Sequence, residues 1–196
     1  MDDPAPLWRS WAQAAARSDI DAALGSLYAE LDAAVAARGP TCWASGKCCR
    51  FDDYGHRLYV TGLEIAWFLR QVRRAEPPAD SANTSAEPVQ PGATGGGMKG
   101  GESAGGGVRL PQLAEHPGAC PYQVGGLCST HLIRPLGCRV FFCQAGTEEW
   151  QQDLYETFLR RLTRLHEQHD VPYRYMDWIA GLEEGTALAT QHADPS

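Results

Sequence analysis

The sequence contains no long run of hydrophobic residues. No apolar segment approaches the roughly 18–20 residues that a helix needs to span a bilayer, so we expect no membrane partner. The N-terminus, which begins Met1-Asp2-Asp3, is acidic and lacks the basic region and apolar core of a secretory signal. We therefore expect a cytoplasmic protein, in a reducing compartment where disulfides are uncommon.

Positive charge is also in short supply. Lysine and arginine together number 17, against 24 aspartate and glutamate residues, and the formal net charge is -7. This acidic balance disfavours general binding to nucleic acid, so we expect no nucleic-acid partner. Hydrophobic residues make up 43% of the 196-residue chain, which is ordinary for a globular protein of one domain.

The middle of the chain, residues 76–107, lacks both aromatic residues and cysteine. Its 32 residues include nine glycines and four prolines. Such a segment cannot bury enough apolar surface to offset the entropy lost on ordering, so we expect a flexible insertion. We expect residues 1–75 and 108–188 to form one domain around it, followed by a loose tail at 189–196.

Apolar periodicity predicts a mainly α fold with short β pieces. The first helical region is expected over residues 7–37, with a helix start marked by Ser18, Asp19 and Asp21, and it ends at Gly39-Pro40. Further helices are expected at about 62–74, 147–169 and 177–188, and a capping box of Thr61 and Glu64 opens the first of these. Short strands are expected at residues 57–60 and 108–110. The N-terminal and C-terminal helices should pack together and hold the cysteine segments between them.

The seven cysteines fall into two clusters. The first comprises Cys42, Cys48 and Cys49, and the second comprises Cys120, Cys128, Cys138 and Cys143. An odd number of cysteines fits poorly with a fully paired disulfide framework. Four basic residues lie beside these thiols and favour their thiolate forms: Lys47, Arg50, Arg134 and Arg139.

Thiolates grouped at short spacings are the ligands that zinc and iron–sulfur clusters prefer. We therefore predict a small cysteine-rich metal site on loops between the helices. All seven cysteines are candidate ligands, and the cofactor is zinc or iron, an iron–sulfur cluster included. Seven thiols exceed the four that one site needs, so either some are packing residues or there are two sites. Adjacent side chains point in different directions, so we expect Cys48 and Cys49 to serve different metal atoms.

The spacing within both clusters is similar to that of a known family. The first block is Cys42, Ser45, Cys48 and Cys49; the second is Cys120-Pro121-Tyr122, Cys128-Ser129 and Arg134-Pro135-Leu136-Gly137-Cys138-Arg139. These blocks resemble the CxxCxxCC (YkgJ-like) family of zinc- or iron-chelating proteins, and the resemblance implies that the chain binds one of these metals. The family has a thiol where this chain has Ser45. Either Cys143 supplies the missing ligand or the serine leaves a coordination position open.

Several histidine and arginine residues are further candidates for the site. His131, three residues after Cys128, is either a nitrogen ligand or a surface turn residue. Arg134 and Arg139 either pair with carboxylates and cap carbonyl groups, or hold an anionic ligand. His166 and His169 lie near a polar helix end, where we expect both to be solvated.

Three kinds of function agree with these observations. The first is a metal-binding protein, with a protein partner left open where the site is structural. The second is an enzyme that uses the site in redox chemistry or group transfer. Related cysteine blocks are similar to those of a flagellin lysine methylase, which implies protein modification, although no S-adenosylmethionine glycine motif is evident. The third is a thiol–disulfide redox protein with Cys48 and Cys49 as a vicinal pair.

Overall fold

The computed structural model describes residues 3–40, 45–75 and 118–191. In these residues the fold is mainly helical, with two small two-stranded sheets, as the sequence predicts. Cys42, the whole 76–107 insertion, the strand expected at 108–110 and the end of the tail lie outside the described residues. No helix in the described ranges is both long and apolar enough to cross a membrane.

The N-terminal helical region consists of two helices, and the second begins at Ser18, where the sequence predicts a helix start. α1 covers Ala5–Ala16 and α2 covers Ser18–Arg38. Between them Arg17 has an extended backbone, with φ -71° and ψ 136°, which turns the chain. α2 ends as predicted at Gly39, whose left-handed backbone (φ 64°) allows its N–H to bond back to the carbonyl of Val35.

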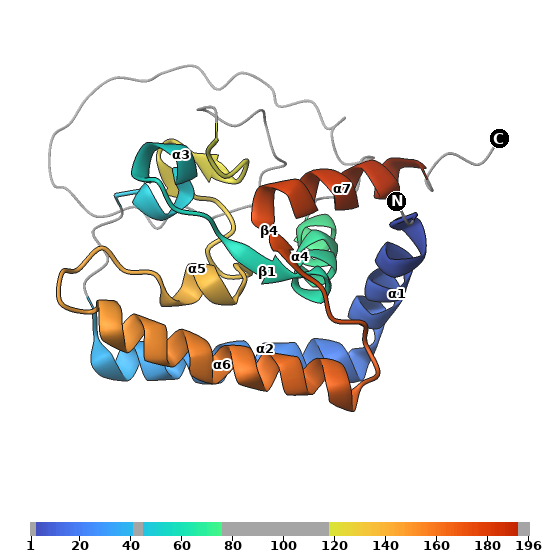
Figure 1. The fold of residues 1–196 in the computed structure, drawn as a ribbon, viewed down its shortest axis with the longest axis horizontal. Helices are drawn as coiled ribbons and strands as arrows, with labels where there is room; N and C mark the ends of the chain where they lie inside the picture. The colour runs from blue at the N-terminus through green and yellow to red at the C-terminus, as the bar shows by residue number, and fades with distance from the viewer. Residues whose placement is uncertain (1–2, 41–44, 76–117, 192–196) are drawn as a thin grey trace, which may run out of the picture.

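α2 lies side by side with α6, Glu148–Gln168, along one edge of the molecule (Figure 1). The two helices are antiparallel, because Asp19 near the start of α2 pairs with His169 just past the end of α6. At the other end, Arg38 of α2 lies over the ring of Trp150 in the first turn of α6. The expected packing of N-terminal against C-terminal helices is therefore confirmed.

A second group of elements packs beside this pair. β1, Tyr59–Thr61, leads into α4, Gly62–Ala75, and pairs antiparallel with β4, Tyr175–Asp177. β4 was not expected from the sequence. It leads into α7, Trp178–Gln191, so the last helix runs into the segment expected to be a loose tail.

The capping box predicted at the start of α4 is present. The Thr61 hydroxyl accepts the N–H of Glu64 (3.3 Å), and the Glu64 carboxylate accepts the N–H of Thr61 (2.9 Å). The other carboxylate oxygen of Glu64 accepts the Tyr28 hydroxyl and the N–H of Leu136, both at 3.0 Å. Burial raises the pKa of Glu64, and these hydrogen bonds oppose the shift. This buried carboxyl thus joins α2, α4 and the segment that carries the second cysteine cluster.

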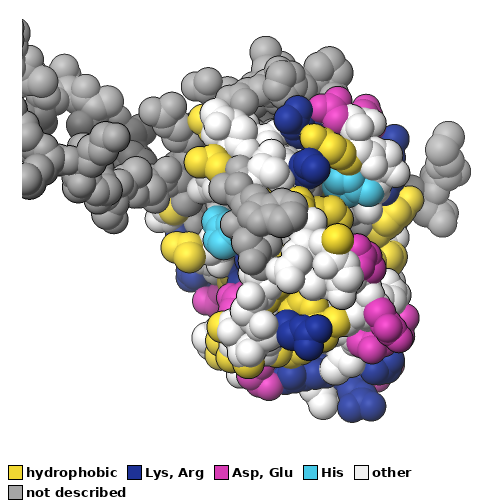
Figure 2. All heavy atoms as spheres, turned by 90° about the vertical axis from the view of Figure 1, so that its left-hand side faces the viewer, with side chains coloured by type: hydrophobic (Ala, Val, Ile, Leu, Met, Phe, Trp, Pro, Cys, Tyr) yellow, Lys and Arg dark blue, Asp and Glu magenta, His cyan; other side chains and the backbone are white. Residues whose placement is uncertain are grey.

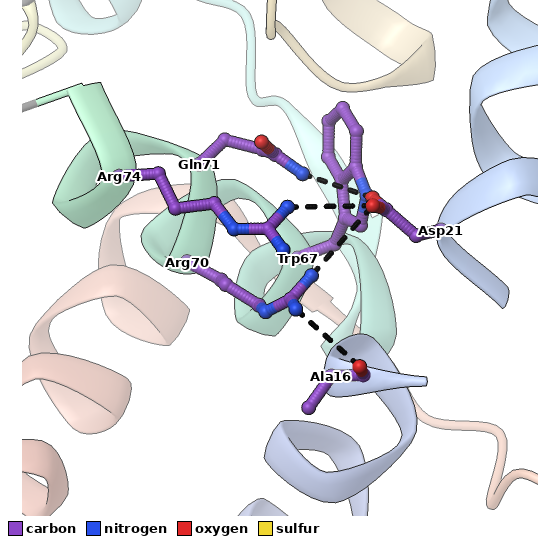
Figure 3. A network of polar contacts seen from close by, with 6 residues as sticks. All are labelled: Ala16, Asp21, Trp67, Arg70, Gln71 and Arg74. Atoms are coloured by element: carbon purple, nitrogen blue, oxygen red, sulfur yellow. Dashed lines mark hydrogen bonds and ion pairs between the residues drawn. The ribbon is translucent and has the colours of Figure 1, made fainter. Parts of the chain in front are cut away.

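Asp21 of α2 makes a second polar connection to α4 (Figure 3). Its carboxylate accepts hydrogen bonds from Trp67 (2.7 Å), Gln71 (3.0 Å) and Arg74 (3.3 Å), and Arg70 lies 3.7 Å away. Burial opposes the charge of Asp21, but the bonds from Trp67 and Arg74 outweigh it and lower the pKa. The angle between the two helices is thereby held by charge as well as by packing.

Short elements carry the cysteines at one end of this helical body (Figure 1). They are the 3-10 turn η1, Lys47–Cys49; α3, Phe51–Tyr54; the hairpin of β2, Gln123–Val124, and β3, Leu127–Cys128; and α5, Leu136–Val140. All are short, so the positions of the cysteines depend on contacts with the helices rather than on long regular structure.

Candidate metal centre

Two cysteine segments that are distant in the sequence lie against each other. The N–H of Cys120 donates to the carbonyl of Cys49 at 2.7 Å, and Arg50 forms an isolated antiparallel bridge with Ala119. The Gln123 side-chain amide donates to the carbonyl of Gly46 at 3.0 Å. These contacts align η1 with the β2–β3 hairpin, so the first and second cysteine clusters face each other.

Gly46 makes this close approach possible. Its backbone is left-handed, with φ 69°, and a Cβ at this position would lie 2.3 Å from the backbone oxygen of Gly126. No side chain larger than hydrogen fits without moving the hairpin. The glycine before Cys48 is therefore required both by the turn and by the neighbouring chain.

Four thiols meet at this junction. The sulfur atoms of Cys48 and Cys49, both on η1, lie 3.9 Å apart. The two adjacent side chains are therefore closer than expected, while their binding to different metal atoms stays a prediction. The Cys49 thiol also interacts with those of Cys120 and Cys128, so it lies at the centre of the group. We call Cys48, Cys49, Cys120 and Cys128 the thiol cluster.

The four thiols of the cluster differ in their pKa values. Hydrogen bonding from Cys49 lowers the pKa of Cys48 to about 7 and that of Cys128 to about 6, and it also lowers the pKa of Cys120. The same contacts raise the pKa of Cys49 itself, because its proton is shared with three neighbours. Cys49 therefore keeps its proton most strongly, while its three neighbours ionise more readily than an ordinary thiol.

Residues outside the cysteines also support the thiolate forms. Trp178 Nε1 donates to Cys120 Sγ at 3.4 Å, and the Thr130 hydroxyl lies 3.6 Å from Cys128 Sγ. The Arg134 guanidinium favours thiolates at Cys48 and Cys128. Trp178 follows Cys120 by 58 residues, and no sequence signal connects the two. Thr130 could have been found, since it stands two residues after a cysteine.

The two remaining described cysteines have different surroundings. The pKa of Cys138 on α5 is raised. Burial is the main cause, and the negative charges of Cys120, Cys128 and Cys48 add to it. Cys143 lies instead against Ser45, with Sγ and Oγ 3.3 Å apart. Cys42 falls outside the described residues, so the structure gives it no position.

The other candidates from the sequence are also placed. His131 is largely exposed, and its partial desolvation, followed by the charges of Arg134 and Arg139, lowers its pKa. Arg139 is buried: it pairs with Asp32 and donates to the carbonyls of Arg134 and Leu132, both at 2.8 Å, which is the structural role considered above. His166 was expected to be solvated but is buried, and its Nδ1 lies 3.2 Å from the carbonyl of Val171.

As they stand, no three or more His, Cys, Asp or Glu side chains within residues 3–40, 45–75 and 118–191 form a group that could hold a metal ion. The donor set of the thiol cluster nevertheless has the right chemistry for a soft metal, since its sulfur atoms come from two segments and several favour the thiolate form. No family model, curated protein or solved structure matches the chain.

Proposed function

We propose that the thiol cluster binds zinc or iron, either as a single ion or as an iron–sulfur cluster. The observation that carries the proposal is the position of Cys49, whose sulfur contacts thiols from both cysteine segments. The CxxCxxCC-like spacing of the sequence supports the same function. Because clustered reduced thiols persist in a reducing compartment, we also propose a cytoplasmic location.

The separation of the sulfur atoms suits such a ligand set. Two sulfur ligands at ~2.3 Å from a tetrahedral zinc ion lie about 3.8 Å apart, and Cys48 and Cys49 are separated by 3.9 Å. Cys48, Cys49, Cys120 and Cys128 would hold the metal, with Cys138 beside them. The metal would neutralise the charges of the thiolates and would cross-link the two cysteine segments. Cys49 must lose its proton on binding, so metal uptake should release protons.

Elemental analysis and absorption spectroscopy of anaerobically purified protein test the proposal. We expect about one equivalent of zinc, or iron with the visible absorption of an iron–sulfur cluster. Cys49→Ser and Cys120→Ser should each lose the metal, whereas Cys143→Ser should keep it because Cys143 lies against Ser45. A folded, colourless and metal-free wild-type protein would contradict the proposal.

One observation favours a second function, thiol–disulfide exchange. Cys48 is partly exposed and its pKa is about 7, so much of it is a thiolate near neutral pH. Its neighbour Cys49 is close enough to serve as the resolving thiol. Titration of free thiols before and after mild oxidation distinguishes this function: exchange requires the loss of two thiols, and metal binding alone does not.

A further inference from the structure

A cleft of about 390 Å³ lies beside the thiol cluster, and Cys48 and Cys138 form part of its wall. Its other lining residues come from the start of α3 and the connection that follows it, from β1 and β4, from α5 and the residue after it, and from the first turns of α6. The volume falls within the range of pockets that take small molecules, roughly 300–1,000 Å³. The cleft is therefore large enough to hold a ligand next to the cysteines.

Tyrosine rings form one part of the lining. Tyr59 of β1 and Tyr175 of β4 stack with their ring centroids 5.6 Å apart and their planes 25° apart, although both remain partly exposed. The Tyr155 hydroxyl of α6 contacts that of Tyr175. Exposed aromatic rings beside a cavity offer flat apolar faces, which favour another planar ring.

His56 forms another part of the lining. Its ring stacks on Phe141, with centroids 5.3 Å apart and planes 13° apart. Its Nε2 is buried from solvent and has no hydrogen-bond partner in the part of the chain that the structure describes. A buried polar atom without a partner is costly, so a small turn of the His56 ring that brings this nitrogen to a ligand hydroxyl in the cleft would gain affinity.

Of the described residues, the two charged side chains that line the cleft have opposite signs. They are Arg57 and Glu148, and Arg57 already has Asp52 at 3.7 Å and Asp177 at 4.0 Å. Hydrophobic side chains lie among basic, acidic and histidine side chains on the face where α6 begins (Figure 2). Because Arg57 is already paired and acids are in excess, the cleft does not attract an anion, and aromatic stacking is the main attraction for an uncharged ligand.

We propose that this cleft binds a small neutral aromatic molecule that carries a hydroxyl group. The ring stacks against the tyrosines, the hydroxyl bonds to His56, and the ligand lies against Cys48 and Cys138. The aromatic lining comes from residues outside the thiol cluster, so binding here does not depend on the metal proposed above. Loss of one function would leave the other open to measurement.

Titration of the full-length chain with p-cresol, followed by ligand-observed NMR, tests the proposal. A ligand of so few atoms should bind with a Kd of about 1 mM. Gln152→Trp places a large side chain at an exposed position that lines the cleft, and Asp153→Trp adds the same side chain at an exposed neighbour that does not. We expect at least tenfold weaker binding by Gln152→Trp and unchanged binding by Asp153→Trp.

A second comparison tests the hydroxyl contact. His56→Phe keeps a ring on Phe141 but removes the nitrogen, so it should weaken p-cresol about fivefold and leave toluene unchanged. Circular dichroism establishes that each variant is folded. The proposal is overturned by no saturable p-cresol binding up to about 10 mM, by equal binding to Gln152→Trp and the wild type, or by equal effects of His56→Phe on the two ligands.

Discussion

The hydroxyl oxygen of Ser45 lies 3.3 Å from the sulfur of Cys143. Ser45 stands where the CxxCxxCC family, which the cysteine spacing resembles, has a thiol, and Cys143 is the last cysteine of the second segment. The two positions are therefore neighbours in space although they are 98 residues apart. This contact gives Cys143 a place beside the substituted position and suggests a direct chemical test.

Ser45→Cys should place two thiols within reach of a disulfide. Forming the bond needs sulfur atoms about 2 Å apart, which a small movement from the present contact achieves. Mild oxidation should then join residues 45 and 143, as shown by peptide mass spectrometry without reduction. The double variant Ser45→Cys/Cys143→Ala should show no such link. Two free thiols at positions 45 and 143 after oxidation of the single variant would contradict the contact.

Replacing Gly46 should disturb the cysteine junction more than replacing Gly55. Both glycines have a left-handed backbone, but a Cβ at Gly55 meets no atom within 4 Å, whereas one at Gly46 meets the backbone of Gly126. Gly55→Ala should cost about 1–2 kcal/mol from backbone strain alone. Gly46→Ala should cost at least about 3 kcal/mol in urea unfolding and should reduce metal content. Equal losses would show that the close approach is unimportant.

Removing the charge of Glu64 should destabilise the fold. Its two oxygens accept bonds from Thr61, Tyr28 and the N–H of Leu136, and an amide would turn one acceptor into a donor facing these donors. Glu64→Gln should lower the free energy of unfolding by about 2 kcal/mol. The same change at the exposed Glu149 should stay within about 0.5 kcal/mol. Chemical denaturation of the two variants makes the comparison.

Arg139 should matter more for stability than its carboxylate partner. Its side chain is buried, stacks on Tyr28 and caps two carbonyls, whereas Asp32 is half exposed. Arg139→Met should cost about 3 kcal/mol because three acceptors lose their donor. Asp32→Asn should cost about 1 kcal/mol, since the carbonyl contacts remain. Unfolding curves that give the opposite order would contradict this assignment.

Asp21 should contribute to acid unfolding. Its folded-state pKa is lowered, so its stabilising effect is complete above the unfolded pKa, about 3.9, and is lost as pH falls towards the folded value. Melting temperatures of the wild type should therefore drop below about pH 4. Asp21→Asn should be less stable at pH 7 and should show a smaller drop over the same interval. A parallel decline in both proteins would exclude this contribution.

Local patterns predicted much of the helical fold. The apolar stripe of α2, the glycine at its end and the capping box of α4 are each encoded by a few neighbouring residues, and all three are confirmed. The start of α2 at Ser18 agrees with the hydroxyl and early acids there, whereas the direction of α1 depends on its packing against α4, which the sequence does not predict. β4 was missed because it is only three residues long and depends on pairing with distant β1.

The cysteine site was only partly readable from the sequence. Two clusters of thiols were visible, but their facing arrangement depends on a backbone bond between Cys49 and Cys120 that no spacing predicts. Cys48 and Cys49 lie in a 3-10 turn, where their sulfur atoms come close together although adjacent side chains were expected to point in different directions. Trp178 and the aromatic lining of the cleft come from segments without any motif, so only tertiary packing brings them to the site.

The bridge between Arg50 and Ala119 joins segments that come from opposite sides of the long glycine- and proline-rich stretch. Helices before that stretch also pack against helices after it. Two separately synthesised polypeptides, 1–75 and 118–196, are thus complementary fragments, and neither has the four sulfur atoms of the cluster by itself. Reassembly of the fragments and completion of the sulfur group would be a single event, so the metal uptake proposed above would report fragment association.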